Sequence, residues 1–568
     1  MRLVSGRLEA GAVPLGLGLL LLIVFLTQGI FFIRANAPTY DEAMHLAAGY
    51  SYLATGDFRL EPQNPPLLKQ YLALPLFLHR LPFRTDTQNW REGLDFFVGQ
   101  DFLYHSPLPA DRMLWLARLP NLSIGALLLV VIGWWAFRLW GAKAAMLAAT
   151  LACFDPNLVA HSSLVTTDIG TTLFIVLTIY LLWEYFSSPT WWLLGAAGVS
   201  LGAALVSKFS AIVLVPIIGL IIARHLIPAR GLSRAFLPLR QPIRLSARVS
   251  NATAALLSIA FFAALMISAA YFFQGFQPWL AGLQRFLSLA RDGQPAFFLG
   301  EYSYQGWWSY YLVAFLIKTP LGSLLLMVLS LLLYRVGSRL KTRDAVFLLL
   351  PVIIILLATT QAKVNIGLRH ILAVYPFLFI LASRLATVQS QRGRPAQLLI
   401  GVALILTIVS SLRIAPHQLA YFNEIIGGPD QGYRYLADSN LDWGQDLKGV
   451  KNYMEKEKLP IIYLSYFGSA PPTYYGIRYQ YVPGTWPLEW PPPGDKVPAA
   501  AHRKILAISA NNLQDVFTPY APLFRWLRQR QPIAKIGYSI FIYDLTEDRE
   551  GLAKLDEVYA KAGIQPPP

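Results

Sequence analysis

The chain has 568 residues, of which 55% are hydrophobic and 14% are charged, and its mean hydropathy is +0.45. One or two water-soluble cores cannot bury this much apolar surface, so the composition excludes an ordinary soluble protein and indicates an integral membrane protein. The formal net charge of +16 does not indicate nucleic acid as a partner, because the arginines are distributed among loops between apolar segments and are not concentrated in one soluble module.

Segments apolar enough to cross about 30 Å of hydrocarbon as helices recur from the N-terminus to about residue 413. The first is predicted to be retained, because it is longer than the apolar core of a signal peptide and lacks a small-residue cleavage site. Residues 191–224 are also compatible with one broken helix, and residues 307–334 with a start as an interfacial helix. We predict eleven spans: 13–33, 113–137, 143–160, 168–186, 191–206, 209–224, 251–273, 307–334, 345–360, 370–387 and 397–413.

Lysine and arginine gather in three loops, at residues 224–248, 335–343 and 384–394. Positive charge marks cytoplasmic loops, and these three alternate correctly with the predicted spans. The N-terminus is therefore predicted to be cytoplasmic, in the plasma or inner membrane. An odd number of spans then places the long loop 34–112 and the residues after 413 on the outer side.

A short acidic stretch, Pro38–Glu42, opens this outer loop directly after the first span. Ionisable groups at a bilayer edge are costly to desolvate, so Asp41 is a candidate functional residue. We predict a helix from Tyr40 to Thr55 that ends at Gly56. Thr39 and Glu42 have the spacing of a capping box, so Glu42 is either a catalytic carboxylate or a cap for this helix.

Two further residues of the predicted helix, His45 and Tyr52, share a face with Asp41. His45 is more typical of a packing or hydrogen-bonding residue than of a metal ligand. Other ionisable groups fall at the same outer ends of predicted spans, where carboxylates and cations together suit chemistry on a phosphate-bearing lipid headgroup; the lysines also have the alternative of snorkelling to the interface. These groups are Asp168, Lys208, Lys318, Lys363, Arg369 and His370.

The region from 414 to 568 is less hydropathic and is predicted to be a soluble α/β domain on the outer side, whereas residues 1–413, with the loop 34–112, form the transmembrane module. Alternating apolar runs at 461–467, 504–509 and 536–543 indicate strands, and residues 445–456 indicate a helix. The fold class that we expect is therefore a polytopic α-helical membrane protein with a C-terminal soluble α/β domain.

The ordered motifs of the chain resemble those of the GT-C membrane glycosyltransferases, and within them the protein O-mannosyltransferase and aminoarabinose transferase group. The resemblance spans most of residues 30–450. It is carried by Tyr40-Asp41-Glu42, Asn64-Pro65-Pro66-Leu67, Asp168, Arg369-His370-Ile371-Leu372 with Tyr375-Pro376, and by the segments Tyr421–Glu424, Gly427–Pro429 and Asp438–Asp446.

The resemblance implies an inverting transfer of a sugar from a polyprenyl-phosphate carrier to a hydroxyl on a protein, lipid or glycan at the outer membrane face. Asp41 would be the general base, with Asp168 orienting the acceptor or supporting the base, and Glu42 beside them as a further catalytic candidate. Cations would stabilise the leaving phosphate. The candidate phosphate ligands are Arg369, Lys318, Lys69 and His370, and the candidate acceptor or sugar contacts are His45, Tyr52 and Tyr304.

The sequence departs from the aminoarabinose branch at Gln63 and Asn64, where that branch has an acidic and a basic residue and the acid helps to hold a metal. Metal dependence is therefore in doubt, and no cofactor is required by the sequence. A divalent cation bound by Asp41, His45 and Glu61 is an alternative route to a metal site.

Two other classes of protein would also place charged groups in a membrane bundle. A flippase or transporter for polyprenyl-linked sugars would handle the same lipid, but transporters show paired repeats and broken helices at mid-membrane depth. This sequence shows no internal repeat, and its polar groups lie at the outer edge. A non-catalytic scaffold for an outer domain would not require Asp41 and Asp168 near a lipid interface.

Overall fold

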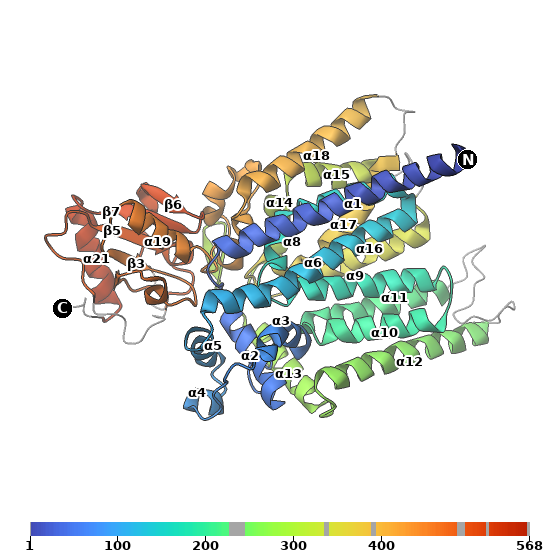
Figure 1. The fold of residues 1–568 in the computed structure, drawn as a ribbon, viewed down its shortest axis with the longest axis horizontal. Helices are drawn as coiled ribbons and strands as arrows, with labels where there is room; N and C mark the ends of the chain where they lie inside the picture. The colour runs from blue at the N-terminus through green and yellow to red at the C-terminus, as the bar shows by residue number, and fades with distance from the viewer. Residues whose placement is uncertain are drawn as a thin grey trace.

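The computed structural model describes residues 2–226, 245–333, 340–387, 394–485, 495–518 and 522–564. The chain is mostly helical, and its long helices lie side by side in one bundle that has a sheet-containing region at one end (Figure 1). Parts of the three cationic loops, at 227–244, 334–339 and 388–393, lie outside the described residues. The orientation inferred from these loops therefore stays a prediction.

Within the described residues, six helices are long and apolar enough to cross a membrane. A seventh candidate is a pair of helices bent by 112° at Thr319 and Pro320, since proline cannot continue the preceding helix. The six are α1 (Arg2–Ala35), α6 (Ala110–Trp140), α9 (Asp168–Tyr185), α12 (Leu245–Ala270), α16 (Thr342–Thr359) and α18 (Arg394–Ile414), and the bent pair is α14 (Tyr310–Lys318) with α15 (Leu321–Leu332).

The other four predicted spans correspond to shorter apolar helices. All eleven predicted segments thus contain helix, but the number that crosses the membrane stays a prediction. The shorter elements are α7 (Ala142–Cys153), followed by α8 (Pro156–Ser162), then α10 (Trp191–Leu205), η1 (Phe209–Val213) with α11 (Leu214–Leu226), and η2 (Leu368–Ile371) with α17 (Val374–Ser383) and η3 (Arg384–Thr387).

Small residues let α10 lie directly against α12. A Cβ atom at Gly198 would come within 2.8 Å of the carbonyl oxygen of Ile259, and one at Gly202 within 2.6 Å of that of Ala263. This small-xxx-small spacing is a common way for membrane helices to pack closely. The break after α10, at residues 206–208, ends the contact and turns Lys208 towards the end of the bundle that faces the sheet.

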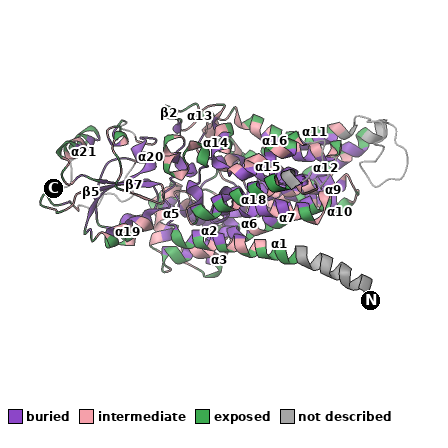
Figure 2. Ribbon diagram, turned by 90° about the horizontal axis from the view of Figure 1, so that it is seen from above, coloured by how far each residue is buried: buried purple, intermediate pink, exposed green. Residues whose placement is uncertain are grey.

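Apolar side chains lie both inside the bundle and on its outer surface. Buried residues gather where the helices face one another, and exposed residues lie on the outward faces of helices such as α1 and α18 (Figure 2). Leu257 on α12 is 66% exposed and Leu398 on α18 is 69% exposed. Exposed leucines along long apolar helices are expected of a protein whose outer surface contacts lipid.

The loop after the first span folds into four helices: α2 (Glu42–Thr55), α3 (Pro66–Leu78), α4 (Gln88–Arg91) and α5 (Asp95–Tyr104). The predicted helix at 40–55 is confirmed, and it ends at Gly56 with a φ of +69°, a conformation that favours glycine. Gly49 allows α2 and α3 to touch, because a Cβ there would lie 2.0 Å from the carbonyl oxygen of Lys69.

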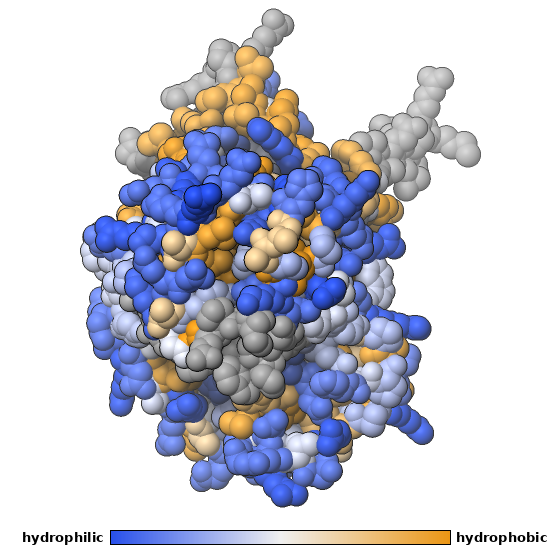
Figure 3. All heavy atoms as spheres, turned by 90° about the vertical axis from the view of Figure 1, so that its left-hand side faces the viewer, coloured by the Kyte–Doolittle hydropathy of each residue, from blue (hydrophilic) through white to orange (hydrophobic). Residues whose placement is uncertain are grey.

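The C-terminal region contains the predicted strands in one five-stranded sheet of order β4-β3-β5-β7-β6. β3 (Ile462–Ser465) is parallel to β4 (Tyr479–Tyr481) and β5 (Ile505–Ser509), whereas β7 (Ile540–Asp544) is antiparallel to β5 and to β6 (Ala534–Ile536). The helices are α19 (Leu447–Lys456), α20 (Ala510–Leu513) and α21 (Arg549–Lys561). Figure 3 looks onto this end of the molecule, where hydrophilic residues cover most of the face and hydrophobic ones form a smaller patch.

The sequence did not indicate the structure of residues 277–303, which follow α12. They form the amphipathic helix α13 (Gln277–Asp292) and the hairpin of β1 (Ala296–Phe298) and β2 (Glu301–Ser303). The predicted boundary at 413/414 between a membrane module and a soluble domain also stays a prediction.

Candidate functional site

Four charged side chains from distant parts of the sequence form a chain at the end of the bundle that faces the sheet. Arg369 Nη1 lies 3.1 Å from Asp41 Oδ2 and 3.9 Å from Asp168 Oδ2. Lys208 Nζ lies 2.5 Å from Asp168 Oδ1. The predicted convergence of these carboxylates and cations is therefore present, and the two charges of each sign balance.

Each of the four side chains is held by the start or end of a helix. Asp41 is the residue before the first turn of α2, and Asp168 is the first residue of α9. Lys208 follows the break after α10, and Arg369 lies in the short helix η2. Helix ends place these four side chains at one end of the bundle, so the cluster does not need charged residues in the middle of the apolar helices.

The two carboxylates of the cluster differ sharply in exposure. The side chain of Asp41 is 22% exposed, whereas that of Asp168 is 1% exposed. A general base must reach the proton it removes. Asp41 can therefore meet an incoming hydroxyl, while Asp168 is enclosed by its two cations.

Several buried polar atoms around the cluster have no hydrogen-bond partner among the residues that the structure describes. They are Arg369 Nε, His370 Nε2 and His161 Nδ1, the last on α8. Below the Arg369 guanidinium lies the ring of Trp443, 4.2 Å from guanidinium carbon to ring centroid. Buried polar atoms without partners are rare in native proteins and need an explanation; a polar substrate group at this place would supply it.

Glu42, the neighbour of Asp41, has a different environment. Both its oxygens are bound by Arg118, Nε to Oε1 at 2.8 Å and Nη2 to Oε2 at 2.6 Å. Backbone N–H groups of Thr39 and Val165 donate to the same carboxylate at 2.7 Å each. Burial raises the pKa of Glu42, but Arg118 and these hydrogen bonds outweigh it and hold the pKa below its ordinary value.

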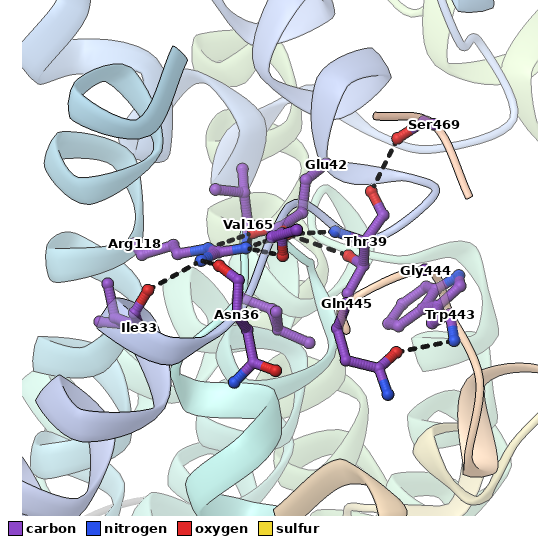
Figure 4. A network of polar contacts seen from close by, with 12 residues as sticks. Ile33, Asn36, Thr39, Glu42, Arg118, Val165, Trp443, Gly444, Gln445 and Ser469 are labelled. Carbon is purple, nitrogen blue, oxygen red and sulfur yellow. Dashed lines mark hydrogen bonds and ion pairs between the residues drawn. The ribbon is translucent and has the colours of Figure 1, made fainter. Parts of the chain in front are cut away.

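Arg118 uses its remaining donors to bind the end of α1 (Figure 4). Glu42 and Arg118 thus lock the outer loop to two spans, and no lone pair of Glu42 remains for a substrate. The geometry argues against the catalytic role predicted for Glu42 and favours the alternative, in which Glu42 caps the helix. The Thr39 N–H group donates to Glu42, as it does in a capping box. The carbonyls bound by Arg118 are those of Ile33, Asn36 and Ala37.

The sequence predicts Lys318 as a phosphate ligand, but its contacts in the structure are those of a structural residue. Its side chain is 2% exposed, and Nζ donates to the carbonyls of Leu419 at 2.9 Å, Tyr421 at 3.0 Å and Asn440. An ammonium group has three donors, so none is left for a phosphate. Lys318 instead fastens α14 to the chain after α18.

A second buried group forms around His45 of α2. His45 Nδ1 lies 2.8 Å from Glu61 Oε2, and Lys69 Nζ lies 3.5 Å from the same oxygen and donates to Tyr52 Oη at 2.8 Å. Lys69 is completely buried and engaged, so its predicted role as a phosphate ligand is not supported. The side chains of His45 and Tyr52 belong to this group, because His45 binds Glu61 and Tyr52 binds Lys69.

Electrostatics in this second group are coupled. Burial raises the pKa of Glu61, but the charges of His45 and Lys69 lower it to about 2. For His45, burial lowers the pKa and Glu61 raises it by more, so the net shift is upward. Each partner therefore favours the charged form of the other.

The predicted metal set does not assemble, since Asp41 pairs with Arg369 while His45 and Glu61 pair with each other. Among the described residues, no group of three or more histidine, cysteine, aspartate or glutamate side chains is placed to hold a metal ion. Tyr304, a candidate sugar contact, is 65% exposed after β2, and no hydrogen bond joins its side chain to the cluster in the part of the chain that the structure describes.

The sequence reasoning missed several residues of the site. Lys208 was recognised only as a lysine at a helix end, and His161, Arg118 and Trp443 were not singled out. His161 and Arg118 are ionisable residues within largely apolar segments, which is a signal that could have found them. Trp443 stands within the turn-rich Asp438–Asp446 segment, but nothing in that pattern indicates a partner for Arg369.

Comparison with known families gives one match. Residues 18–278 match the model of the family described as dolichyl-phosphate-mannose-protein mannosyltransferase. No curated protein matches the chain.

Solved structures give weaker similarities. ArnT from Cupriavidus metallidurans in the apo state shares 14% identity over 94% of this chain and 98% of its own, with a TM-score of 0.47. The same protein bound to undecaprenyl phosphate gives 13% identity over 93% and 97%, also with a TM-score of 0.47. The Archaeoglobus fulgidus oligosaccharyltransferase tethered with an acceptor peptide gives 11% identity over 81% of this chain and 59% of its own, with a TM-score of 0.40.

Proposed function

We infer that the chain is a membrane glycosyltransferase that takes its sugar from a lipid-linked donor, because residues 18–278 match the family model described as dolichyl-phosphate-mannose-protein mannosyltransferase. In finer terms, the donor is a polyprenyl-phosphate sugar, and the acceptor is a hydroxyl on a protein, a lipid or a glycan. One observation carries this proposal above the others: an accessible carboxylate, Asp41, lies beside a guanidinium, Arg369, whose buried Nε has no partner.

The reaction is a single displacement at the anomeric carbon. Asp41 accepts the proton of the acceptor hydroxyl, and the acceptor oxygen forms the new glycosidic bond. The bond between the anomeric carbon and the phosphate oxygen breaks on the opposite face, so the configuration inverts. The electron pair of that bond leaves with the polyprenyl phosphate, whose developing negative charge needs preorganised cations.

Arg369 is the proposed ligand of that phosphate. Its fork-shaped guanidinium can engage two oxygens, and its Nε is the donor that lacks a partner. Lys208 stands on the far side of Asp168 from Arg369, with its side chain 15% exposed, and supplies the second positive charge. His370 follows Arg369 and offers an unpaired Nε2 to the same space.

Asp168 acts through the cations in this proposal. Its buried carboxylate binds Lys208 and approaches Arg369, which holds both positive charges close together despite their repulsion. It is thus a positioning residue, and Asp41 is the residue that contacts the acceptor.

The proposed orientation follows from the three cationic loops. The N-terminus lies in the cytoplasm, and the site and residues 414–568 lie on the outer side of the plasma or inner membrane.

Release of polyprenyl phosphate tests the proposal. Purified protein in lipid is given a panel of polyprenyl-phosphate sugars, with and without extracts that contain hydroxyl acceptors, as wild type and as Asp41→Asn. We expect acceptor-dependent release that falls by at least about 100-fold in Asp41→Asn, since a missing general base typically costs that much. Asp57→Asn is the matched control, because Asp57 is a partly exposed carboxylate of the same loop that pairs only with Arg59.

A flippase would give another result. Labelled lipid would appear in the opposite leaflet, independently of residue 41, and no donor would release polyprenyl phosphate. That outcome would overturn the transferase proposal, because a flippase needs no base beside the phosphate.

A further inference from the structure

One segment of the C-terminal half contacts both members of the Asp41–Arg369 pair. This segment is residues 438–446, called the 438–446 loop below. It begins with the short helix η7 (Asp438–Asn440). On the Arg369 side, the N–H of Leu368 donates to Asn440 Oδ1 at 3.0 Å. The ring of Trp443, only 1% exposed, stacks against the Arg369 guanidinium at 4.2 Å.

The same loop also holds the backbone that carries Asp41. The N–H of Tyr40, next to Asp41, donates to the carbonyl of Trp443 at 2.9 Å, and the N–H of Ala37 donates to that of Gln445 at 2.8 Å. Figure 4 shows Trp443, Gly444 and Gln445 beside this part of the outer loop. Two segments 328 residues apart in the sequence are thus joined through a third.

Several buried residues fasten the loop to the sheet region: Tyr466 and Ser539 bind Gly444 and Asp446, and Asn511 makes the largest set of contacts. Asn511, at the start of α20 directly after β5, donates from Nδ2 to the carbonyl of Asp442 at 2.9 Å and from its N–H to Asp442 Oδ2 at 2.9 Å. Its Oδ1 accepts the N–H of Asp438 at 2.7 Å. Three hydrogen bonds from one residue fix both ends of the turn that presents Trp443.

We propose that the 438–446 loop positions the phosphate-binding group of this site: the Trp443 ring fixes the plane of the Arg369 guanidinium, and Asn511 anchors that ring to the C-terminal sheet. The proposal rests on the function proposed above. A guanidinium stacked on an aromatic face gains from the ring while its edge N–H groups stay available for other partners. Trp443 therefore steadies Arg369 without occupying the donors that a phosphate needs. Trp443 and Asn511 are positioning residues, and the sheet region becomes part of the site.

Binding of a carrier analogue tests the role of Trp443. Farnesyl phosphate is titrated into detergent-solubilised wild type, Trp443→Leu, Trp443→Phe, Arg369→Lys and the double variant Trp443→Leu/Arg369→Lys. We expect Trp443→Leu to weaken binding about tenfold, the scale of a desolvated cation–π contact, and Trp443→Phe to restore most of it. The double variant should bind no more weakly than Arg369→Lys alone, because both changes disturb one interaction.

Asn511 has a matched control in its neighbour. Asn512 is equally buried on the same helix, but it binds Ser465 and Thr485 within the sheet region. We expect Asn511→Ala to raise the KM for the donor several-fold and to weaken farnesyl phosphate binding, whereas Asn512→Ala leaves both unchanged at equal folded yield. Equal effects of the two variants would mean that only general packing was lost, and would overturn the role of Asn511.

The outcomes separate the two proposals. If wild type and Trp443→Leu bind farnesyl phosphate with the same affinity, the positioning role is overturned and the transferase proposal stays intact. Wild type that neither binds farnesyl phosphate nor releases polyprenyl phosphate from any donor overturns the transferase proposal, and with it the positioning role. Additive losses in the double variant also contradict the proposal, since they would show that Trp443 acts independently of Arg369.

Discussion

Arg118 and Glu42 meet in a two-point contact that excludes solvent, with 1% and 0% of their side chains exposed. The contact joins α6 to the first residue of α2, one position after Asp41. The proposed base, Asp41, is therefore positioned by a neighbouring residue that has no part in the proposed chemistry.

Breaking this pair should destabilise the protein strongly. Arg118→Met and Glu42→Gln each leave a buried charge or orphaned donors, which typically costs roughly 3–5 kcal/mol. The apparent Tm in detergent should fall markedly for each single variant, and less than additively for Arg118→Met/Glu42→Met. Should Glu42→Gln keep the wild-type Tm and lose only turnover, the catalytic role predicted from the sequence would be restored.

Removing the cation beside Asp168 should affect the donor more than the fold. Lys208→Met removes one of the two positive charges near the proposed phosphate site, and we expect kcat/KM for the donor to fall by about 10- to 100-fold, as for loss of a preorganised electrostatic contact. Lys208→Arg should keep much of the activity. Donor kinetics at matched protein yield measure this, and an unchanged kcat/KM in Lys208→Met would remove Lys208 from the site.

Replacing Lys318 should affect the stability of the fold more than the kinetics of the donor, the opposite of what we expect for Lys208. Lys318→Met leaves three backbone carbonyls without their donor, so the apparent Tm should fall by an amount that reflects about 1–3 kcal/mol for each buried unsatisfied group. The KM for the donor of the remaining folded protein should stay unchanged. Lys363→Met is the control, because Lys363 binds one carbonyl, that of Arg291, in an exposed position. A raised KM without loss of stability would return Lys318 to the phosphate site.

The His45–Glu61 pair predicts how stability depends on pH. The pKa of Glu61 falls from an ordinary 4.5 to about 2 on folding, so its contribution is present above pH 4.5 and is lost as the pH drops towards 2. The pKa of His45 rises above its ordinary 6.5, so its contribution is complete below pH 6.5 and is lost as the pH rises through the folded value.

The apparent Tm of wild type should therefore fall as the pH is raised above about 6.5. His45→Gln should lack that part of the fall, and its decline below pH 4.5 should be smaller, because Lys69 remains but the charge of His45 no longer lowers the pKa of Glu61. Thermal unfolding of both proteins from pH 3 to pH 9 measures the difference. Parallel curves for the two proteins above pH 6.5 would contradict the shift assigned to His45.

Local pattern was enough to predict the elements that depend on neighbouring residues. Gly56 ends α2 because a left-handed residue closes a helix, and the apolar run before Asp41 forms α1. The alternating run at 504–509 became β5 for the same reason. The grouping of Asp41, Asp168 and Arg369 was also anticipated, since polar residues at the ends of spans tend to share one side of a bundle.

Partner choice could not be predicted in the same way. Lys208 and Lys318 both stand at the end of an apolar segment, yet one pairs with a carboxylate and the other with three carbonyls from a distant turn. His45 shares a helical face with Asp41 by spacing, but the approach of Glu61 drew it into another group. These differences arise from tertiary contacts that a single sequence does not encode locally.

The 112° bend between α14 and α15 has a consequence for how the molecule is made. The bend leaves carbonyls at the end of α14 without intrahelical partners, and Asn423 supplies them: its Nδ2 donates to Leu316 at 2.6 Å and to Thr319 at 3.0 Å. Unpaired carbonyls are costly near lipid. A nascent chain that has been synthesised only to α18 therefore holds an unfinished membrane segment, which the arrival of residues 419–440 completes.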